Sequence, residues 1–237
     1  MTTPVLELAG VSAEYGPFRA LFGVSLRVEP GQAVALVGSN GAGKTTVARV
    51  ASGLIPPTSG TVAVNGDDMT GARTYRFAQA GVAHATEGRS VFATLSVEEN
   101  LTLSFRRVHG RAGVRTSLER AYELFPVLGM RRSQIAGTLS GGEQRMLSLA
   151  RVMVEQPKIL IADELSLGLA PIIVTSLYDS LARLRAQGTA LLIVEQQIGH
   201  ALALADQVAL LDHGTVTWTG NSADAASVVH QAFQPTH

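Results

Sequence analysis

A glycine-rich stretch between an apolar run and a helical pattern restricts the fold more than any other feature of the sequence. Residues 38–45 read GSNGAGKT and fit the pattern G-x-x-x-x-G-K-[ST]. The run AVALV precedes them and TTVARVASGL follows them, so a strand should enter the stretch and a helix should begin at its end. Backbone N–H groups in such a loop can surround phosphate oxygens, and the helix dipole favours an anion there. The stretch therefore predicts a phosphate-binding loop and nucleotide binding, with a plain glycine-rich turn as the structural alternative.

Individual residues of this loop have expected roles. Lys44 should reach the β- and γ-phosphates, and the hydroxyl of Thr45 should be a ligand of Mg²⁺. The residues expected to bind the nucleotide are Gly38, Ser39, Asn40, Gly41, Ala42, Gly43, Lys44, Thr45 and Thr46.

A second motif, LSGGEQ, occupies residues 139–144 and precedes an apolar helical pattern. Ser140 and Glu143 have the spacing of a capping box, which is the structural interpretation. Two glycines in a first helical turn are poor helix formers, however, and bare N–H groups at a helix start form an anion site. We therefore expect this turn to approach a ligand.

A third motif, KILIADE at residues 158–164, is an apolar strand that ends in two carboxylates. Asp163 is expected to hold the Mg²⁺ shell, and Glu164 is expected to orient and deprotonate the attacking water. Without the phosphate loop, a carboxylate that caps the next helix would be the preferred interpretation.

The remaining pattern predicts an α/β chain. Strand-like runs alternate with helical patterns after residue 140, which is typical of a mainly parallel sheet covered on both faces. The middle of the chain is helical and begins with a capping box at Ser96 and Glu99. Residues 106–117, RRVHGRAGVRTS, are expected to form a solvated basic loop between two helices.

Composition excludes several classes of protein. The 237 residues are 46% hydrophobic, which is too apolar for a disordered chain. The formal net charge is zero, so no basic surface for nucleic acid is expected. No apolar run reaches the length that spans a bilayer, and the absence of cysteine excludes disulfides and thiolate zinc sites.

The three motifs, in this order, resemble those of the ATP-binding subunit of ABC transporters over nearly the whole chain. The resemblance implies ATP and Mg²⁺ as ligands and a P-loop NTPase fold of the ABC-ATPase type. This is an α/β fold in which a mainly parallel core sheet carries an antiparallel N-terminal β part and an inserted α-helical subdomain. A single domain is expected, with residues 1–86 and 140–237 as the core lobe and 87–139 as the helical subdomain. The family also implies a head-to-tail dimer, in which Ser140, Gly141 and Gly142 complete the partner's site.

Further roles follow from the resemblance. Tyr15 matches the aromatic residue that stacks on adenine, with ordinary packing as the alternative. Glu87 replaces the family's glutamine between the lobes. Gln196 replaces the switch histidine, and its amide can still donate one hydrogen bond to the γ-phosphate. We therefore expect a slow ATPase dominated by Glu164, and we interpret His200 as a helix-surface residue.

Within the family, several short sequence motifs are similar to those of the LivF-type branch. They are EGR, VF, LSVEENL, SLGLAP and VEQ. Ala162, Leu165, Ala170 and the triplet HAT at residues 84–86 depart from the usual motifs. The branch implies a peripheral subunit at the cytoplasmic face of the membrane that energises import of branched-chain or other amino acids. Its expected partners are a second ATPase subunit (identical or different), two transmembrane permeases and an extracytoplasmic solute-binding protein. Alternatives are a urea or amide importer, an exporter, or a non-transport ABC ATPase, which a single phosphate loop and zero net charge disfavour.

Overall fold

The computed structural model describes residues 2–86, 91–196 and 198–232. The chain forms two compact units. The first comprises Met1–His84, Lys158–Glu164 and Arg185–His237, and the second comprises Ala85–Pro157 and Leu165–Leu184. The second unit thus includes residues 140–157 and 165–184, which the sequence analysis assigns to the core lobe. The expected lobe boundaries within a single domain stay a prediction.

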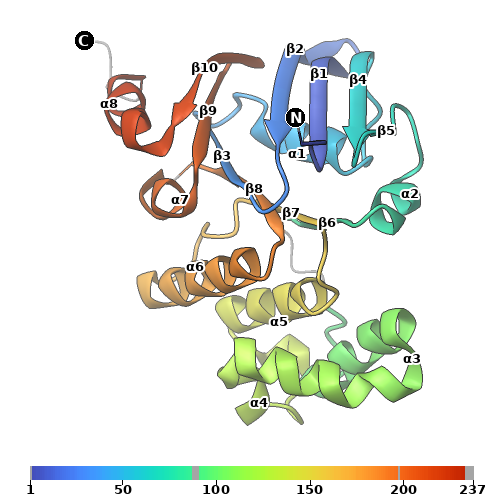
Figure 1. The fold of residues 1–237 in the computed structure, drawn as a ribbon. Coiled ribbons are helices and arrows are strands. Elements are labelled where there is room, and N and C mark those ends of the chain that lie inside the picture. Colours follow the sequence, from blue (N-terminus) through green and yellow to red (C-terminus); the bar gives the residue numbers. More distant parts are fainter. Residues whose placement is uncertain (1, 87–90, 197, 233–237) are drawn as a thin grey trace. The chain divides into compact units, whose positions relative to one another are not determined.

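A four-stranded antiparallel sheet forms one part of the first unit, with the strand order β2-β1-β4-β5 (Figure 1). Its strands are β1 (Leu6–Tyr15), β2 (Phe18–Val28), β4 (Ser59–Val64) and β5 (Asp67–Asp68). Buried and exposed residues alternate along the end of β2, as one covered face requires. This sheet is the antiparallel β part that the sequence analysis expects.

A six-stranded sheet has the order β10-β9-β3-β8-β7-β6. Its strands are β3 (Ala33–Val37), β6 (Val82–Ala85), β7 (Ile159–Asp163), β8 (Ala190–Glu195), β9 (Gln207–Asp212) and β10 (Thr215–Asn221). The pairs β3–β8, β3–β9 and β7–β8 are parallel, whereas β9–β10 is antiparallel. Every residue of β3, β7 and β8 is buried, which explains why these strands read as unbroken apolar runs. Parallel strands end at one edge of a sheet, so β3 and β7 deliver the phosphate loop and the two carboxylates to the same edge.

The helices of the first unit are α1 (Lys44–Ala51), α2 (Thr74–Gln79), α7 (Ile198–Leu204) and α8 (Ser222–Ala232). The core of this unit is a cluster of buried apolar side chains from both sheets, α1 and α2. Val47, Ala48 and Ala51 of α1 are fully buried, so the helix behind the phosphate loop is anchored in the core.

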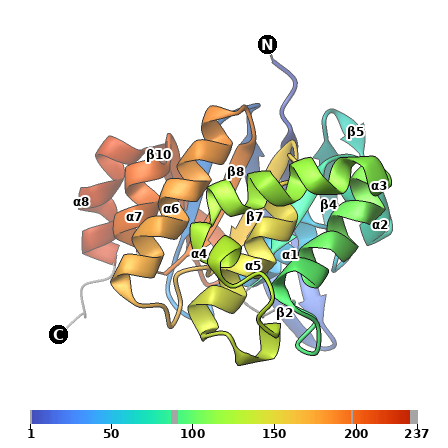
Figure 2. The same cartoon turned by 90° about the horizontal axis from the view of Figure 1, so that it is seen from below.

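The second unit is helical. It contains α3 (Val97–Leu124), α4 (Pro126–Met130), the 3₁₀ turn η1 (Ala136–Thr138), α5 (Gly141–Met153) and most of α6 (Pro171–Ala186). Figure 2 shows α3, α4 and α5 packed beside one another. The expected capping box at the start of α3 is confirmed, because Ser96 and Glu99 bond each other's backbone N–H groups.

The expectation of a loop at residues 106–117 is wrong. These residues lie within α3, and only Gly110 leaves the helical region, with φ 67° and ψ −177°. Most of the segment is exposed and polar, which led to the loop interpretation, but exposed arginines are good helix formers. Gly110 accommodates the break because it has no Cβ to clash at positive φ.

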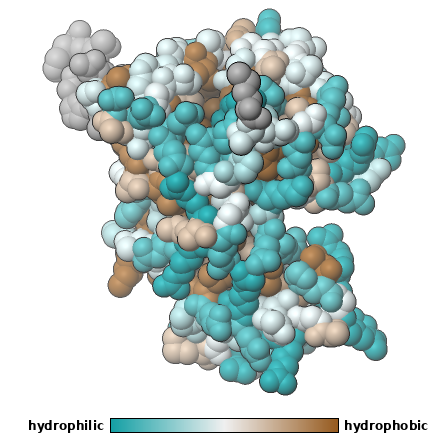
Figure 3. All heavy atoms as spheres, viewed as in Figure 1, coloured by the Kyte–Doolittle hydropathy of each residue, from teal (hydrophilic) through white to brown (hydrophobic). Residues whose placement is uncertain are grey.

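Hydrophilic and hydrophobic residues are mixed on the face drawn in Figure 3. Within the described ranges, no helix combines the length and the apolar character that crossing a bilayer requires.

Candidate nucleotide-binding site

The phosphate loop leaves β3 at Gly38, and the backbone there allows no side chain. A Cβ at Gly38 would collide with the carbonyl oxygen of Leu211 in the neighbouring strand β9. The first glycine of the motif is therefore required by the close approach of two chain segments.

The end of the loop is held by the turn between β9 and β10. The amide of Gly214 donates to the carbonyl of Ala42 at 2.8 Å, and Phe22 donates to the carbonyl of Gly214 at 2.9 Å. Gly43 has φ 103°, and a Cβ there would lie 3.0 Å from the carbonyl oxygen of Ala20. Hydrogen bonds on one side and close packing on the other thus hold the end of the loop against residues that are distant in sequence.

Lys44 is the first residue of α1, and its side chain is only 3% exposed. Its Nζ donates to the carbonyls of Gly38 and Ser39 at 3.1 Å each and lies 3.4 Å from Oε1 of Glu164. A buried ammonium group needs such partners, because desolvation of an unpaired charge is costly. The ammonium group is therefore fixed inside the loop, beside the carboxylate that the sequence analysis identifies as the general base.

Thr45 and Asp163 meet although 118 positions separate them. The hydroxyl of Thr45 donates to Oδ1 of Asp163 at 3.4 Å, and the carboxylate is almost fully buried at the end of β7. Among the described residues, no group of three or more acidic or histidine side chains could hold a metal ion alone. A hydroxyl and one carboxylate suit Mg²⁺, which binds oxygen ligands and takes its remaining ones from phosphates and water. The donor set therefore fits the expected ion.

Glu164 has an uncommon backbone conformation for a residue with a side chain, with φ 49°. Its N–H donates to the carbonyl of Val194 in β8 at 2.8 Å, which holds the strained residue in place. Residues in such conformations cluster at functional sites. The hydrogen bond to β8 thus fixes the backbone of Glu164 directly after Asp163.

Lys44, Thr45 and Glu164 line a cleft of about 530 Å³ in the first unit, whereas Asp163 is not among its lining residues. The expected loop residues Gly38, Ser39, Asn40 and Ala42 are not among them either. The residues expected from the sequence that line it are Gly41, Gly43, Lys44, Thr45, Thr46 and Glu164. Arg19, Phe22 and His213 also line the cleft, although nothing in the sequence predicts them there. The Arg19 guanidinium lies 5.0 Å from the ring centre of Phe22. No motif marks these residues, because they reach the cleft only through the pairing of β2 and the β9–β10 turn with the loop.

Other expected site residues do not line this cleft. Tyr15 is 41% exposed, and its hydroxyl accepts from Nη1 of Arg49 at 3.3 Å. Gln196 is exposed after β8, and His200 is exposed on α7, as its surface interpretation requires. Glu87 lies outside the described residues. The roles of Tyr15, Glu87 and Gln196 stay predictions.

The LSGGEQ motif lies in the second unit, where Ser140 caps α5. Its hydroxyl accepts from the amide of Glu143 at 3.3 Å, and its own amide donates to Oε2 of Glu143 at 2.8 Å. The structural interpretation of the motif, a capping box, is therefore confirmed. The first turn of α5 still presents the amides of Gly141 and Gly142, which have no partner within a helix.

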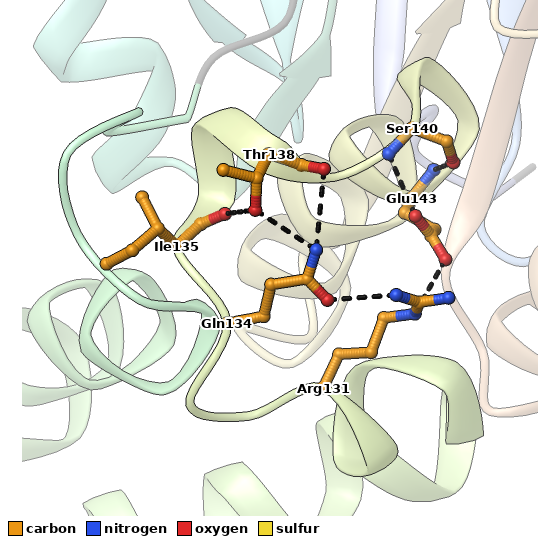
Figure 4. Close-up of polar contacts among 6 residues, drawn as sticks. All are labelled: Arg131, Gln134, Ile135, Thr138, Ser140 and Glu143. Atoms are coloured by element: carbon orange, nitrogen blue, oxygen red, sulfur yellow. Dashed lines mark hydrogen bonds and ion pairs between the residues drawn. The ribbon is translucent and has the colours of Figure 1, made fainter.

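A chain of polar contacts supports this cap (Figure 4). Nε of Arg131 lies 2.8 Å from Oε1 of Glu143, and Nη1 of Arg131 donates to Gln134 at 2.9 Å. Gln134 in turn donates to the hydroxyl of Thr138 at 3.0 Å. The side chain of Glu143 is thus fixed from two sides, and the turn that carries Ser140 is held through it.

Comparisons with known proteins agree with these features. The family model described as ABC transporter matches residues 21–166. The high-affinity branched-chain amino acid transport ATP-binding protein BraG of Pseudomonas aeruginosa is 38% identical over 212 residues, which cover 90% of this chain and 91% of that protein. The probable branched-chain amino acid transport ATP-binding protein LivF of Archaeoglobus fulgidus is 32% identical and covers 97% of both chains. A solved structure of an ATP-binding subunit of an ABC transporter has a TM-score of 0.84 at 25% identity and covers 97% of this chain and 95% of that chain.

The similar solved structure confirms the α/β fold expected from the sequence. The family model matches more than half of the chain and includes all three motifs. The chain therefore belongs to the ABC transporter family, as one of its ATP-hydrolysing subunits.

Proposed function

We propose that this chain hydrolyses Mg²⁺-bound ATP to drive import of branched-chain or chemically related amino acids. The convergence of Lys44, Thr45, Asp163 and Glu164 on one edge of the parallel sheet supports the chemistry. The printed names of the relatives BraG and LivF support the class of substrate.

In the proposed mechanism, the loop amides and Lys44 bind the β- and γ-phosphates. Lys44 exchanges the loop carbonyls and Glu164 for phosphate oxygens, so nucleotide binding releases the carboxylate of Glu164. Glu164 then orients a water molecule in line with the γ-phosphate and accepts its proton. Gln196 donates a neutral hydrogen bond to the same phosphate. Thr45 and Asp163 would hold Mg²⁺, which neutralises charge on the phosphate oxygens when bound.

The second unit is proposed to act on a partner subunit. In a head-to-tail dimer, Ser140, Gly141 and Gly142 present the start of α5 to the nucleotide held by the other phosphate loop. The two glycine amides and the dipole of this 13-residue helix suit a phosphate group. Closure on ATP and opening after hydrolysis would then transmit force to membrane permeases.

The proposed setting is the cytoplasmic face of the membrane, with this chain as a peripheral subunit. Its partners would be two permeases, a second ATPase subunit that is either identical or different, and an extracytoplasmic solute-binding protein. A tagged chain, purified from gently solubilised membranes of its native cell, tests this assembly by identification of the co-purifying proteins.

Recovery of two multi-span permeases with a second ATPase is the expected result. The associated binding protein is then screened against leucine, isoleucine, valine, urea and short amides by thermal shift, with stabilisation by the branched-chain amino acids expected. Recovery of ribosomal or DNA-repair proteins without a permease would overturn the transport assignment and leave the ATPase chemistry intact.

A further inference from the structure

A buried histidine lies next to Asp163, the proposed magnesium ligand. His84 lies on β6, the strand next to β7, and its side chain is 7% exposed. Its Nδ1 lies 2.9 Å from Oγ of Ser52, and its Nε2 faces Oδ2 of Asp163 at 3.7 Å. Nε2 is a buried atom with no hydrogen-bond partner within 3.5 Å among the described residues. All three residues belong to the first unit.

The contacts of Ser52 permit the proton of the His84 ring to lie on Nε2. Its hydroxyl can donate to the carbonyl of Ala48 at 2.9 Å, to that of Arg49 at 3.2 Å, or to Nδ1 of His84. Both carbonyls already accept backbone N–H groups, from Ser52 and Leu54 respectively. Donation from Ser52 to Nδ1 therefore leaves no carbonyl unsatisfied.

The opposite arrangement is electrostatically unfavourable. If Nδ1 carried the proton, the lone pair of Nε2 would face the buried carboxylate of Asp163. Two electron-rich atoms 3.7 Å apart at low dielectric repel each other, whereas an Nε2–H group at this distance is attracted by the carboxylate. The geometry assigns the proton to Nε2.

We infer that His84 is a positioning residue that orients Asp163 for the metal ion. The two carboxylate oxygens are divided between two neighbours: Oδ1 lies near the hydroxyl of Thr45, and Oδ2 lies near Nε2–H of His84. An Nε2–H group 3.7 Å from Oδ2 attracts this oxygen electrostatically and so favours the rotation of the carboxylate that keeps Oδ1 beside Thr45. Loss of a group that orients a metal ligand typically lowers metal affinity or activity by about 10- to 100-fold. The inference rests on the proposed function, in which Thr45 and Asp163 hold Mg²⁺.

Two amide substitutions separate the two ring nitrogens. In His84→Gln the amide nitrogen takes the place of Nε2 and keeps a donor toward Asp163. In His84→Asn the shorter amide reaches only the place of Nδ1, so the contact with Ser52 is kept and the donor to Asp163 is lost. Both variants retain a neutral polar side chain at a buried position, which matches them for burial.

The measurement is Mn²⁺ affinity, from the electron paramagnetic resonance signal of free Mn²⁺, with the protein saturated by a non-hydrolysable ATP analogue. No turnover is needed. We expect His84→Asn to weaken Mn²⁺ binding about tenfold and His84→Gln less than about threefold. Affinity for the analogue in the presence of a chelator should be unchanged in both variants, because the phosphate loop is not altered.

Asp163→Asn and Thr45→Val serve as reference variants for the metal site. Wild-type Mn²⁺ affinity in His84→Asn, together with weakened binding in Asp163→Asn, overturns the role of His84 and leaves the proposed function standing. Wild-type affinity in both reference variants overturns the metal site itself. If His84→Asn does not fold, Mn²⁺ affinity is measured in Ser52→Ala instead, because this variant removes the hydroxyl that holds the His84 ring. A loss of about threefold supports the inference, and unchanged affinity contradicts it.

Discussion

The starts of α1 and α5 are both rich in glycine, but they are capped in different ways. Helix α1 begins after Gly43, which has a left-handed backbone and offers no side-chain hydrogen bond to the helix. Helix α5 begins after Ser140, whose capping box with Glu143 is complete. A side-chain cap stabilises a helix by about 1 kcal/mol, so α1 forgoes stability that α5 retains.

The difference indicates how much of each helix end is available to a ligand. The amides at the start of α1 are not used by side-chain caps, and core packing of Val47 and Ala48 keeps the helix in place instead. At α5 the box engages the amides of Ser140 and Glu143, which leaves those of Gly141 and Gly142 to approach a phosphate. The phosphate loop is thus suited to surround a nucleotide. The turn formed by the LSGGEQ motif at residues 139–144, called the signature turn below, is suited to contact a nucleotide from a single side.

Replacement of Glu164 is expected to have the largest effect. Glu164→Gln removes the proton acceptor and keeps the shape of the side chain, so kcat for ATP hydrolysis should fall by about 10²- to 10⁴-fold while ATP affinity is retained. Steady-state phosphate release and equilibrium binding of a fluorescent ATP analogue measure the two quantities. Full turnover by the variant would show that Glu164 is not the general base.

Replacement of Lys44 tests whether the phosphate loop binds the nucleotide. Lys44→Ala removes a buried cation that is expected to bind phosphates, so affinity for the ATP analogue should fall about 10- to 100-fold. Lys158→Ala is the matched control, because Lys158 is the other lysine in the sequence and is exposed outside the cleft. Equal losses of affinity in the two variants would mean that Lys44 acts only through the net charge of the protein and not through a contact with the phosphates.

Mixed subunits test whether the signature turn acts on the partner. A Lys44→Ala chain and a Ser140→Arg chain should each hydrolyse ATP at a small fraction of the wild-type rate. In a mixed dimer, one of the two sites is intact. The Ser140→Arg chain supplies its phosphate loop, and the Lys44→Ala chain supplies its signature turn. We expect mixing to raise the rate severalfold above either variant alone. A mixture no more active than its components would place Ser140 in the site of its own chain.

Two aromatic residues are candidates for stacking on the nucleotide base. Tyr15 is expected from the resemblance, whereas Phe22 lines the cleft and is 46% exposed. Loss of one base–aromatic stack costs about 1–3 kcal/mol, so Tyr15→Leu should weaken ATP binding about tenfold. Phe22→Leu is the comparison variant. A larger loss in Phe22→Leu than in Tyr15→Leu would transfer the stacking role to Phe22.

The smallest expected effect concerns the stability of the α5 cap. Ser140→Ala removes the side-chain acceptor for the amide of Glu143 and should lower the free energy of unfolding by about 1 kcal/mol. Urea denaturation measures this change. Ser227→Ala, at an exposed serine of α8 in the first unit, is the control and should change the stability by less. An unchanged unfolding free energy in Ser140→Ala would mean that the box contributes nothing to the helix.

The sequence by itself determined the parts of this protein that depend on neighbouring residues. Unbroken apolar runs indicated β3, β7 and β8, because a strand that is buried on both faces carries apolar residues at successive positions. The phosphate loop between β3 and α1 and the caps at Ser96 and Ser140 were readable because short, fixed spacings encode them. The same local reasoning failed at residues 106–117, where exposed polar residues concealed a helix that only Gly110 interrupts.

The tertiary structure decided which distant residues meet. Gly38 must be glycine because β9 passes beside it, and Lys44 lies beside Glu164 because β3 and β7 both pair with β8. The adjacency of β6 and β7 brings His84 next to Asp163, a contact that no sequence motif indicates. Such contacts join positions up to more than a hundred residues apart, and their geometry follows from strand order and register. A linear pattern contains neither of these, so the chemistry of the site could be predicted from the sequence and its arrangement could not.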